Sequence, residues 1–178
     1  MITIIIGTNR TKSEAGNFGK QYYNELVRQG EDVNLLHLKD ISPNLYHAEM
    51  YDEPIQKGLL EVQEKFMLPA KKFIFIIPEY NGGMPGAVKL FIDALSIHER
   101  NATFSQKKAA IVGVAAGRAG NLRGMEHLTG ILNYLNTTVL PNRQPYSSIY
   151  KLVDKSGKIT DEATLKLIQQ HVEQIIKF

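Results

Sequence analysis

Short runs of apolar residues alternate with amphipathic segments along the whole chain. Ile2–Ile6 and Phe73–Ile77 are nearly continuous runs of β-branched and aromatic residues, which is typical of strands buried on both faces of a parallel sheet. Three further runs predict strands of the same kind over Val33–Leu38, Ala109–Ala116 and Thr137–Leu140. The pattern therefore predicts five buried strands.

Between and after these runs, apolar residues recur every three or four positions, the period of a helix that buries one face. The clearest example is Phe18, Tyr22 and Leu26, a face that Gly30 closes. The same period predicts four further helices, at residues 55–67, 86–98, 128–135 and 160–176. Two segments lack the period and are expected to be loops, residues 39–54 and 141–157.

Each predicted strand is followed by a predicted helix, and this alternation favours a parallel sheet with helices on both faces. We expect a flavodoxin-like three-layer α/β fold whose five-stranded sheet has the order 2-1-3-4-5. No repeat, low-complexity tract or linker interrupts the alternation. The sequence therefore predicts a single domain over residues 1–178.

Composition narrows the classes of chemistry. The chain has no cysteine, which excludes disulfides, zinc–thiolate sites and a thiolate nucleophile. Its 21 basic and 18 acidic residues give a net charge of +3, and without a dense Lys/Arg cluster this argues against a nucleic-acid partner. The first seven residues have no basic leader, and no apolar run approaches a membrane span. We expect a cytoplasmic protein.

Three unusual loops follow the first, third and fourth predicted strands. They are Gly7–Ser13, Pro78–Gly86 and Ala115–Asn121. Because the carboxyl ends of parallel strands share one edge of a sheet, these loops are expected on the same side of the molecule. In the predicted strand order the first and third strands flank the topological switch point, where such sheets bind ligands. The three loops are therefore expected to line one site.

The first loop has the groups that bind an anion. Thr8 and Ser13 offer hydroxyls, Arg10 offers a planar set of donors, and the next helix offers free N–H groups at its positive end. The Gly-x-Gly-x-x-Gly fingerprint is absent, and a P-loop would need a glycine directly before Lys12. A phosphate monoester fits best, although Ser13 as a helix cap beside a solvated Arg10 is an alternative.

The second and third loops suit a flat ligand. Pro78 ends the strand, Gly82 allows close backbone approach, Tyr80 offers an apolar face, and Asn81 offers an amide edge. Gly117 gives the third loop the same freedom. The alternative is a pair of ordinary turns. Together with the first loop, this pattern favours a planar heterocycle that carries a phosphate.

These motifs resemble those of a known family. Gly7-Thr-Asn-Arg with Ser13, Pro78-Glu-Tyr-Asn81, and Pro85-Gly-Ala-Val-Lys89 with Asp93 resemble the NADPH-dependent FMN reductases, flavodoxin-like flavoproteins that include quinone, azo-dye and chromate reductases. The resemblance runs from the first strand to about residue 135. It implies that the FMN phosphate is held by Thr8, Arg10 and Ser13. It also implies that the isoalloxazine ring is bordered by Pro78, Glu79, Tyr80, Asn81, Gly82 and Gly117.

The resemblance implies FMN as cofactor and NADPH or NADH as co-substrate, with ping-pong transfer to a quinone-like, azo or other small acceptor, or to free flavin. A bound flavin carries this chemistry, so we expect no catalytic side chain and no metal. The histidines are scattered and are interpreted as ordinary surface or boundary residues. Arg118 or Arg123 could meet the nicotinamide cofactor's phosphate, or be solvated. Two alternatives stay open: a flavodoxin-type electron carrier, and a flavin-free regulatory protein.

The resemblance also implies a homodimer or homotetramer built through the helix at residues 86–98. Apolar Phe91, Ile92 and Leu95 on that helix suit a contact between subunits, but core packing explains them equally well. The sequence differs from the family pattern at three positions in or near this helix. Gly83, Leu90 and Ala94 stand where the family often has Ser, Asn and Trp.

Overall fold

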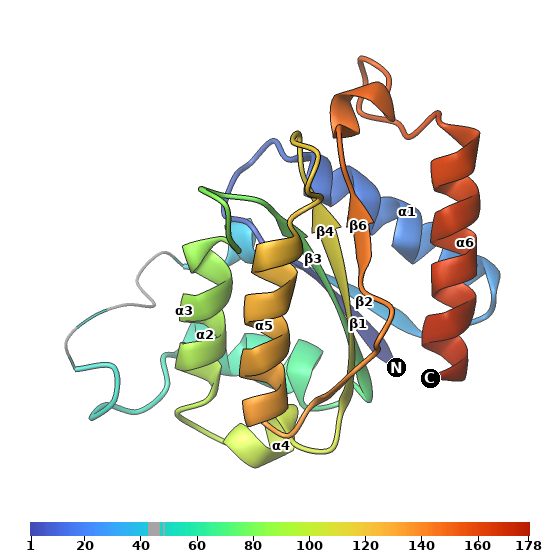
Figure 1. Ribbon diagram of the computed structural model, residues 1–178. Helices are drawn as coiled ribbons and strands as arrows, with labels where there is room; N and C mark the ends of the chain where they lie inside the picture. The colour runs from blue at the N-terminus through green and yellow to red at the C-terminus, as the bar shows by residue number, and fades with distance from the viewer. Residues whose placement is uncertain (43–46, 48) are drawn as a thin grey trace.

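The computed structural model describes residues 1–42, 47 and 49–178. Its core is a parallel sheet in the order β2-β1-β3-β4-β5, drawn in Figure 1. Four of the strands are β1 (Ile2–Ile6), β2 (Val33–His37), β3 (Lys72–Pro78) and β4 (Lys108–Val114). β1 pairs with both β2 and β3, and β3 pairs with β4. The predicted fold class and strand order are confirmed.

The fifth strand is split into two short pieces. β5 (Thr138–Val139) pairs with the beginning of β4, and β6 (Gln144–Tyr146) pairs with its end. The loop predicted over residues 141–157 is therefore wrong in part, since this segment contains β6 and a 3₁₀ turn, η3 (Ile149–Lys151). Pro141 has no N–H for the ladder between the pieces, and Pro145 is tolerated because β6 lies at the edge of the sheet.

Helices cover both faces of the sheet, as predicted. α1 (Glu14–Arg28) and α6 (Glu162–Lys177) lie together on one face. The other face is covered by α2 (Lys57–Val62) with its π-helical continuation η2 (Gln63–Met67), α3 (Gly86–Leu95) and α5 (Leu122–Tyr134), as Figure 1 shows. No described helix is long and apolar enough to cross a membrane.

Two short elements were not predicted because neither spans two helical turns. They are η1 (Leu38–Asp40) and α4 (Arg100–Phe104). η1 lies at the start of the segment predicted to be a loop, residues 39–54. Pro43, one of the two prolines behind that prediction, lies outside the described residues.

Both faces of the sheet are buried, which explains the continuous apolar runs. Phe73 and Phe75 of β3 pack under α2, α3 and α5, while Ile74 and Ile76 pack under α1 and α6. Side chains that alternate between two covered faces are all apolar. The sheet therefore positions its carboxyl-end loops on a rigid support.

A buried polar chain crosses the α1–α6 face. Tyr146 is hydrogen-bonded to Tyr22 (Oη to Oη, 3.1 Å), Tyr22 donates to Nδ1 of His171 (2.8 Å), and His171 Nε2 donates to the carbonyl of Asn142 (3.1 Å). The prediction of a surface or boundary residue is wrong for His171, which is 1% exposed. Burial lowers the pKa of His171 to about 4, so the ring is neutral at physiological pH.

Candidate functional site

The three predicted loops meet at the carboxyl edge of the sheet, at the top of Figure 1. They surround a cavity of ≈ 930 Å³. Six of the nine predicted site residues line it: Thr8, Arg10, Ser13, Pro78, Glu79 and Tyr80. Ala115 and Ala116 at the end of β4 complete this part of the wall. One cavity therefore spans the ends of β1, β3 and β4, across the topological switch point.

The first loop is fixed against the second by a long-range hydrogen bond. Thr8 is 1% exposed, and its hydroxyl lies 2.5 Å from the Tyr80 hydroxyl. The Thr8 hydroxyl also accepts the N–H of Arg10 (3.2 Å). A Cβ at Gly7 would lie 2.8 Å from side-chain carbons of Ile77 and Val88, so only glycine lets the chain turn here. The two loops form one rigid wall.

The end of the cavity at α1 is suited to an anion. Ser13, Ala15 and Gly16 line it at the first turn of α1, which is the positive end of the helix dipole. The Gly16 N–H there donates to the Ser13 carbonyl (3.0 Å). Ser13 is the N-cap residue of α1, as the alternative interpretation expected, although its side chain makes no capping hydrogen bond. The Arg10 guanidinium is exposed and forms no ion pair with any residue in the described ranges. These donors are available to a ligand.

The second loop is a tight hairpin turn. Tyr80 and Gly83 pair in both directions (N to O, 3.0 and 3.1 Å), and Asn81 and Gly82 between them have φ of 52° and 76°, as in a type I′ turn. Because the Gly83 N–H closes this turn, it does not face a ligand. Asn81 and Gly82 are not among the lining residues; they form the tip of the hairpin beside the cavity.

The third loop is packed tightly against its neighbours. A Cβ at Gly113 of β4 would collide with the Gly120 carbonyl, and one at Gly120 would lie 2.6 Å from Pro145. Gly117 is exposed and its carbonyl accepts the Ser148 N–H (3.1 Å), but it does not line the cavity. The third loop therefore contributes residues next to β4 to the cavity wall, and Gly117 lies outside the lining of the cavity.

Sequence reasoning missed the role of Asn121, at the start of α5. Its side-chain amide donates to the carbonyls of Ile77 (3.2 Å) and Pro78 (2.9 Å), so it ties the third loop to the end of β3. Its Oδ1 is buried without a partner among the described residues. The available signal was an asparagine just before a helix, a residue type that tolerates the left-handed backbone found here (φ 63°).

A further wall of the cavity comes from the segment predicted to be loop. Ile149, Tyr150 and residues 155–157 line the cavity beside α1. A Cβ at Gly157 would collide with the Asn17 side chain, so the segment lies directly on α1. Asp154 holds it in shape by accepting the N–H groups of Ser156 (2.8 Å) and Lys158 (3.1 Å).

The lining of the cavity is positively charged. Five cationic side chains line it against two carboxylates: Arg10, Lys12, Lys20, Lys39 and Lys155, against Glu14 and Glu79. Within the described part of the chain, no cluster of three or more His, Asp or Glu is arranged to hold a metal ion. Such a lining favours an anionic ligand.

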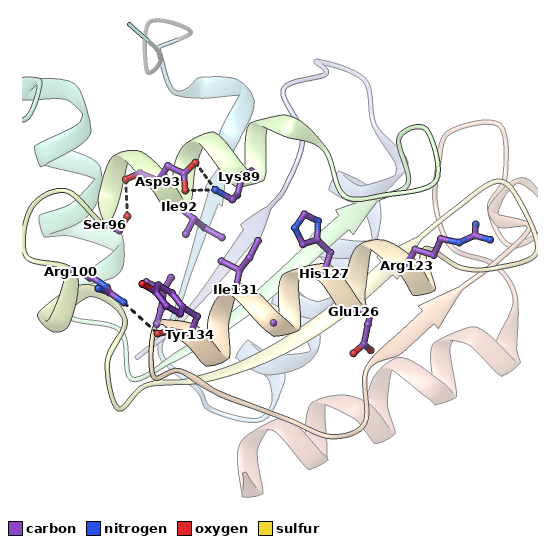
Figure 2. Close-up of a pocket in the computed structure, with 12 residues that line it drawn as sticks. Lys89, Ile92, Asp93, Ser96, Arg100, Arg123, Glu126, His127, Ile131 and Tyr134 are labelled. Atoms are coloured by element: carbon purple, nitrogen blue, oxygen red, sulfur yellow. Dashed lines mark hydrogen bonds and ion pairs between the residues drawn. The ribbon is translucent and has the colours of Figure 1, made fainter. Parts of the chain in front are cut away.

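A second concavity lies between α3 and α5, away from the loops. Figure 2 shows this groove of ≈ 820 Å³, with Ile92 and Ile131 between Lys89 and Asp93 of α3 and Tyr134 of α5. Lys89 and Asp93 form an ion pair (2.7 Å), and the Tyr134 side chain is 74% exposed. Phe91, Ile92 and Leu95, which suited a subunit contact and core packing equally, are all buried in the core.

The geometry fits a flat ring with a phosphate tail. One end of the cavity has the exposed Arg10 guanidinium, the Ser13 hydroxyl and the N-terminus of α1, and the other end is framed by Pro78 and Tyr80 at the switch point. The donor set at the α1 end matches a phosphate monoester. Fold and cavity together define a flavodoxin-like protein of the flavin-binding class.

Comparison with known proteins gives the family. Residues 1–151 match the model of the NADPH-dependent FMN reductases. The chain is 32% identical over 153 residues to an NAD(P)H-dependent FMN reductase of Pseudomonas aeruginosa, covering 84% of this chain and 80% of that protein. It is 24% identical over 174 residues to a 2-hydroxy-1,4-benzoquinone reductase of a Burkholderia species, covering 97% and 92%. The chain belongs to the NADPH-dependent FMN reductase family.

Solved structures agree on the fold. The NAD(P)H:(acceptor) oxidoreductase FerB of Paracoccus denitrificans superposes with a TM-score of 0.83 at 21% identity, covering 99% of this chain and 94% of that one. The predicted family, the oxidoreductase class and the dependence on FMN and NAD(P)H are confirmed by membership. The alternatives of an electron carrier and a flavin-free regulatory protein are not supported.

Proposed function

We propose that the cavity at the carboxyl edge of the sheet binds FMN and that the enzyme reduces small quinone-like or azo acceptors, or free flavin. The observation that carries this proposal is the single cavity in which the α1 N-terminus, Arg10 and Ser13 lie at one end and Pro78 and Tyr80 at the other. Each half alone is an ordinary turn. Together they match the two chemically different ends of FMN.

In this proposal the FMN phosphate is held by Thr8, Arg10 and Ser13. Arg10 supplies a charge-assisted contact, Ser13 a hydroxyl, and the first turn of α1 its N–H groups. Thr8 also holds Tyr80 in place through their hydrogen bond of 2.5 Å. Loss of this bond would loosen both loops.

The isoalloxazine ring is proposed to lie against Pro78, Glu79 and Tyr80, which line the cavity. Asn81, Gly82 and Gly117 are proposed to border the ring from outside this lining, since each lies within two positions of a lining residue in the sequence. The Glu79 N–H donates to the Val114 carbonyl (3.1 Å) and Asn121 donates to Pro78. Because both bonds fix backbone at this edge, the ring would meet a preformed surface.

Bound FMN supplies the chemistry, since it takes a hydride from NAD(P)H and passes the electrons on. The side chains of this protein bind and orient the partners, and none is assigned a proton-transfer role. We propose ping-pong turnover, in which the oxidised nicotinamide leaves before the acceptor enters. The relatives named quinone reductases and FMN reductases support the choice of acceptors.

The test is an anaerobic titration of the FMN-loaded protein. Addition of NADPH or NADH is expected to bleach the flavin absorption bands, and later addition of a benzoquinone is expected to restore them at once. Bleaching without recovery would remove the acceptor class from the proposal. Absence of bleaching with both nicotinamides would contradict the reductase function of this chain.

We further propose that two copies associate as a homodimer through the groove between α3 and α5, or as a homotetramer built from two such dimers. The groove combines the partly exposed Ile131 with an exposed Tyr134 ring, a composition common at interfaces. Arg123 at its end reaches the tip of the second loop, 3.9 Å from the position of a Cβ at Gly82. The interface would therefore adjoin the flavin.

Sedimentation of the native protein and of Ile131→Glu tests this. The native protein is expected to sediment as a dimer or tetramer, and the variant as a monomer of 20.0 kDa. A native monomer would contradict the proposal.

We also propose that residues 1–178 form one domain and that the protein works in the cytoplasm, where its nicotinamide co-substrate is supplied.

A further inference from the structure

The cavity extends well past the proposed phosphate site. Beyond the first turn of α1 it continues between α1 and the edge strand β2, where it is lined by Gly16, Lys20, Tyr23 and Asn24 of α1 and by Leu35, His37 and Lys39. We call this part the edge lobe. From Gly16 to Asn24 the helix rises by about 12 Å, so the lobe is long enough for a further chemical group.

The order of the strands places the edge lobe on the far side of the phosphate from the ring. Reading across the sheet, β4 and β3 carry the loops of the proposed ring site, β1 carries the phosphate loop, and β2 borders the edge lobe. A Cβ at Gly16 would lie 4.0 Å from His37 Cε1, so the His37 ring in the edge lobe lies beside the first turn of α1, where the phosphate site is proposed. A group in the edge lobe would therefore be attached to, or lie next to, the flavin phosphate.

The side chains in the edge lobe suit a second phosphate and an aromatic base. Lys20 is exposed and forms no ion pair with any residue that the structure describes. Lys39 is paired with Asp40 (2.6 Å), so Lys20 is the cation available to a ligand. Tyr23 and His37 are half-buried rings that offer faces for stacking, and Asn24 offers an amide edge.

We propose that the edge lobe binds the adenylate half of FAD, so that this protein accepts FAD as well as FMN with the flavin in the same place. The proposal rests on the proposed phosphate site at Arg10 and Ser13. It adds the edge lobe as a binding site for a phosphate bearing a nucleoside. In FAD that second phosphate is joined directly to the flavin phosphate, as the place of the edge lobe beside the proposed phosphate site requires.

The test is a binding titration of the flavin-free protein with FMN and with FAD, followed by flavin fluorescence. FAD is expected to bind at least as tightly as FMN. Lys20→Glu is expected to weaken the binding of FAD about fivefold to tenfold and the binding of FMN less than about threefold. Asn24→Trp fills the edge lobe from an exposed position and is expected to weaken the binding of FAD only. Lys57→Glu, at an exposed lysine of α2, is the matched control for charge and is expected to change neither.

A second probe is 5′-AMP, which is expected to displace FAD at millimolar concentration without displacing FMN. If FMN binds and FAD binds more than about tenfold more weakly, the edge lobe is not an adenylate site and the proposed function stands. Equal loss of FMN and FAD in Lys20→Glu would also overturn the inference. If neither flavin binds the native protein, the phosphate site itself is wrong and the proposed function fails with it.

Discussion

The two edges of the sheet use positive charge in opposite ways. At the amino edge, Lys72 donates to the carbonyls of Ile175 and Ile176, and Lys107 donates to those of Met67 and Leu68. These lysines donate to carbonyls at the carboxyl ends of helices, where intrahelical donors run out. At the carboxyl edge, Arg10 is not engaged in this way.

The difference explains why a basic sequence does not imply a nucleic-acid surface here. The lysine pairs 71–72 and 107–108 look like the beginning of a basic patch, yet three of these four lysines bond main-chain carbonyls, including that of the last residue, Phe178. Burial lowers the pKa of Lys107 to about 8. Charge at the amino edge serves the fold, and charge at the carboxyl edge is available to a ligand.

The largest expected effect comes from the tight packing of the carboxyl edge. Gly113→Ala places a methyl group against the Gly120 carbonyl and 3.0 Å from Met125 Sδ, so the third loop must move. We expect a loss of about 3 kcal/mol in the free energy of unfolding together with weaker FMN binding. Gly58→Ala is the control, because a Cβ there meets nothing within 4 Å. Urea denaturation measures the free energy of unfolding of both variants, and equal stability of the two would contradict the packing argument.

His171, buried between α1, α6 and β6, predicts how stability depends on pH. Its folded pKa of about 4 lies below the ordinary value of 6.5, so between these values the unfolded chain binds the proton. The contribution of His171 to the free energy of unfolding is therefore fully present above pH 6.5. It is lost as the pH drops from about 6.5 to about 4, by up to about 3 kcal/mol. Thermal melts from pH 7 to pH 4 measure it. His171→Gln is expected to flatten the profile, and an unchanged slope in this variant would assign the pH dependence to other groups.

Arg10→Leu separates binding from folding at the carboxyl edge. Loss of the charged contact is expected to weaken FMN binding about tenfold to 100-fold without lowering the melting temperature of the flavin-free protein, because Arg10 is exposed and forms no ion pair in the described chain. Fluorescence titration and thermal denaturation measure the two quantities. Arg28→Leu, on the far end of α1, serves as the control for FMN affinity alone, because Arg28 is paired with Glu25.

Lys107→Met is the opposite case at the amino edge. It leaves two carbonyls without their donor and is expected to cost about 1 kcal/mol of stability while FMN affinity stays unchanged. Lys57→Met, where the side chain is 90% exposed, is expected to cost nothing measurable. A drop in FMN affinity in Lys107→Met would break the distinction between the two edges.

Much of the fold could be predicted because strong local patterns control it. Continuous apolar runs such as Phe73–Ile77 identify strands covered on both faces, and the loops that follow them must share an edge. β6 was missed because three residues containing a proline carry no strand pattern. It forms because the edge of β4 needs a partner, which is a tertiary requirement.

The candidate site was predicted less completely for the same reason. Thr8, Arg10 and Ser13 follow a strand and were identified from residue type and position. The bond between Thr8 and Tyr80 joins residues 72 positions apart, and the anchoring of Pro78 by Asn121 depends on a backbone conformation that only the folded chain shows. Contacts between loops are not encoded in any one loop.

We propose that the carboxyl edge recognises a flavin through its phosphate. The most direct measurement compares FMN with riboflavin, which lacks the phosphate, by calorimetric titration of the flavin-free protein. We predict that FMN binds at least about 100-fold more tightly, and that raising the salt concentration narrows the difference. Equal affinities for the two flavins would show that Arg10, Ser13 and the α1 N-terminus do not hold a phosphate.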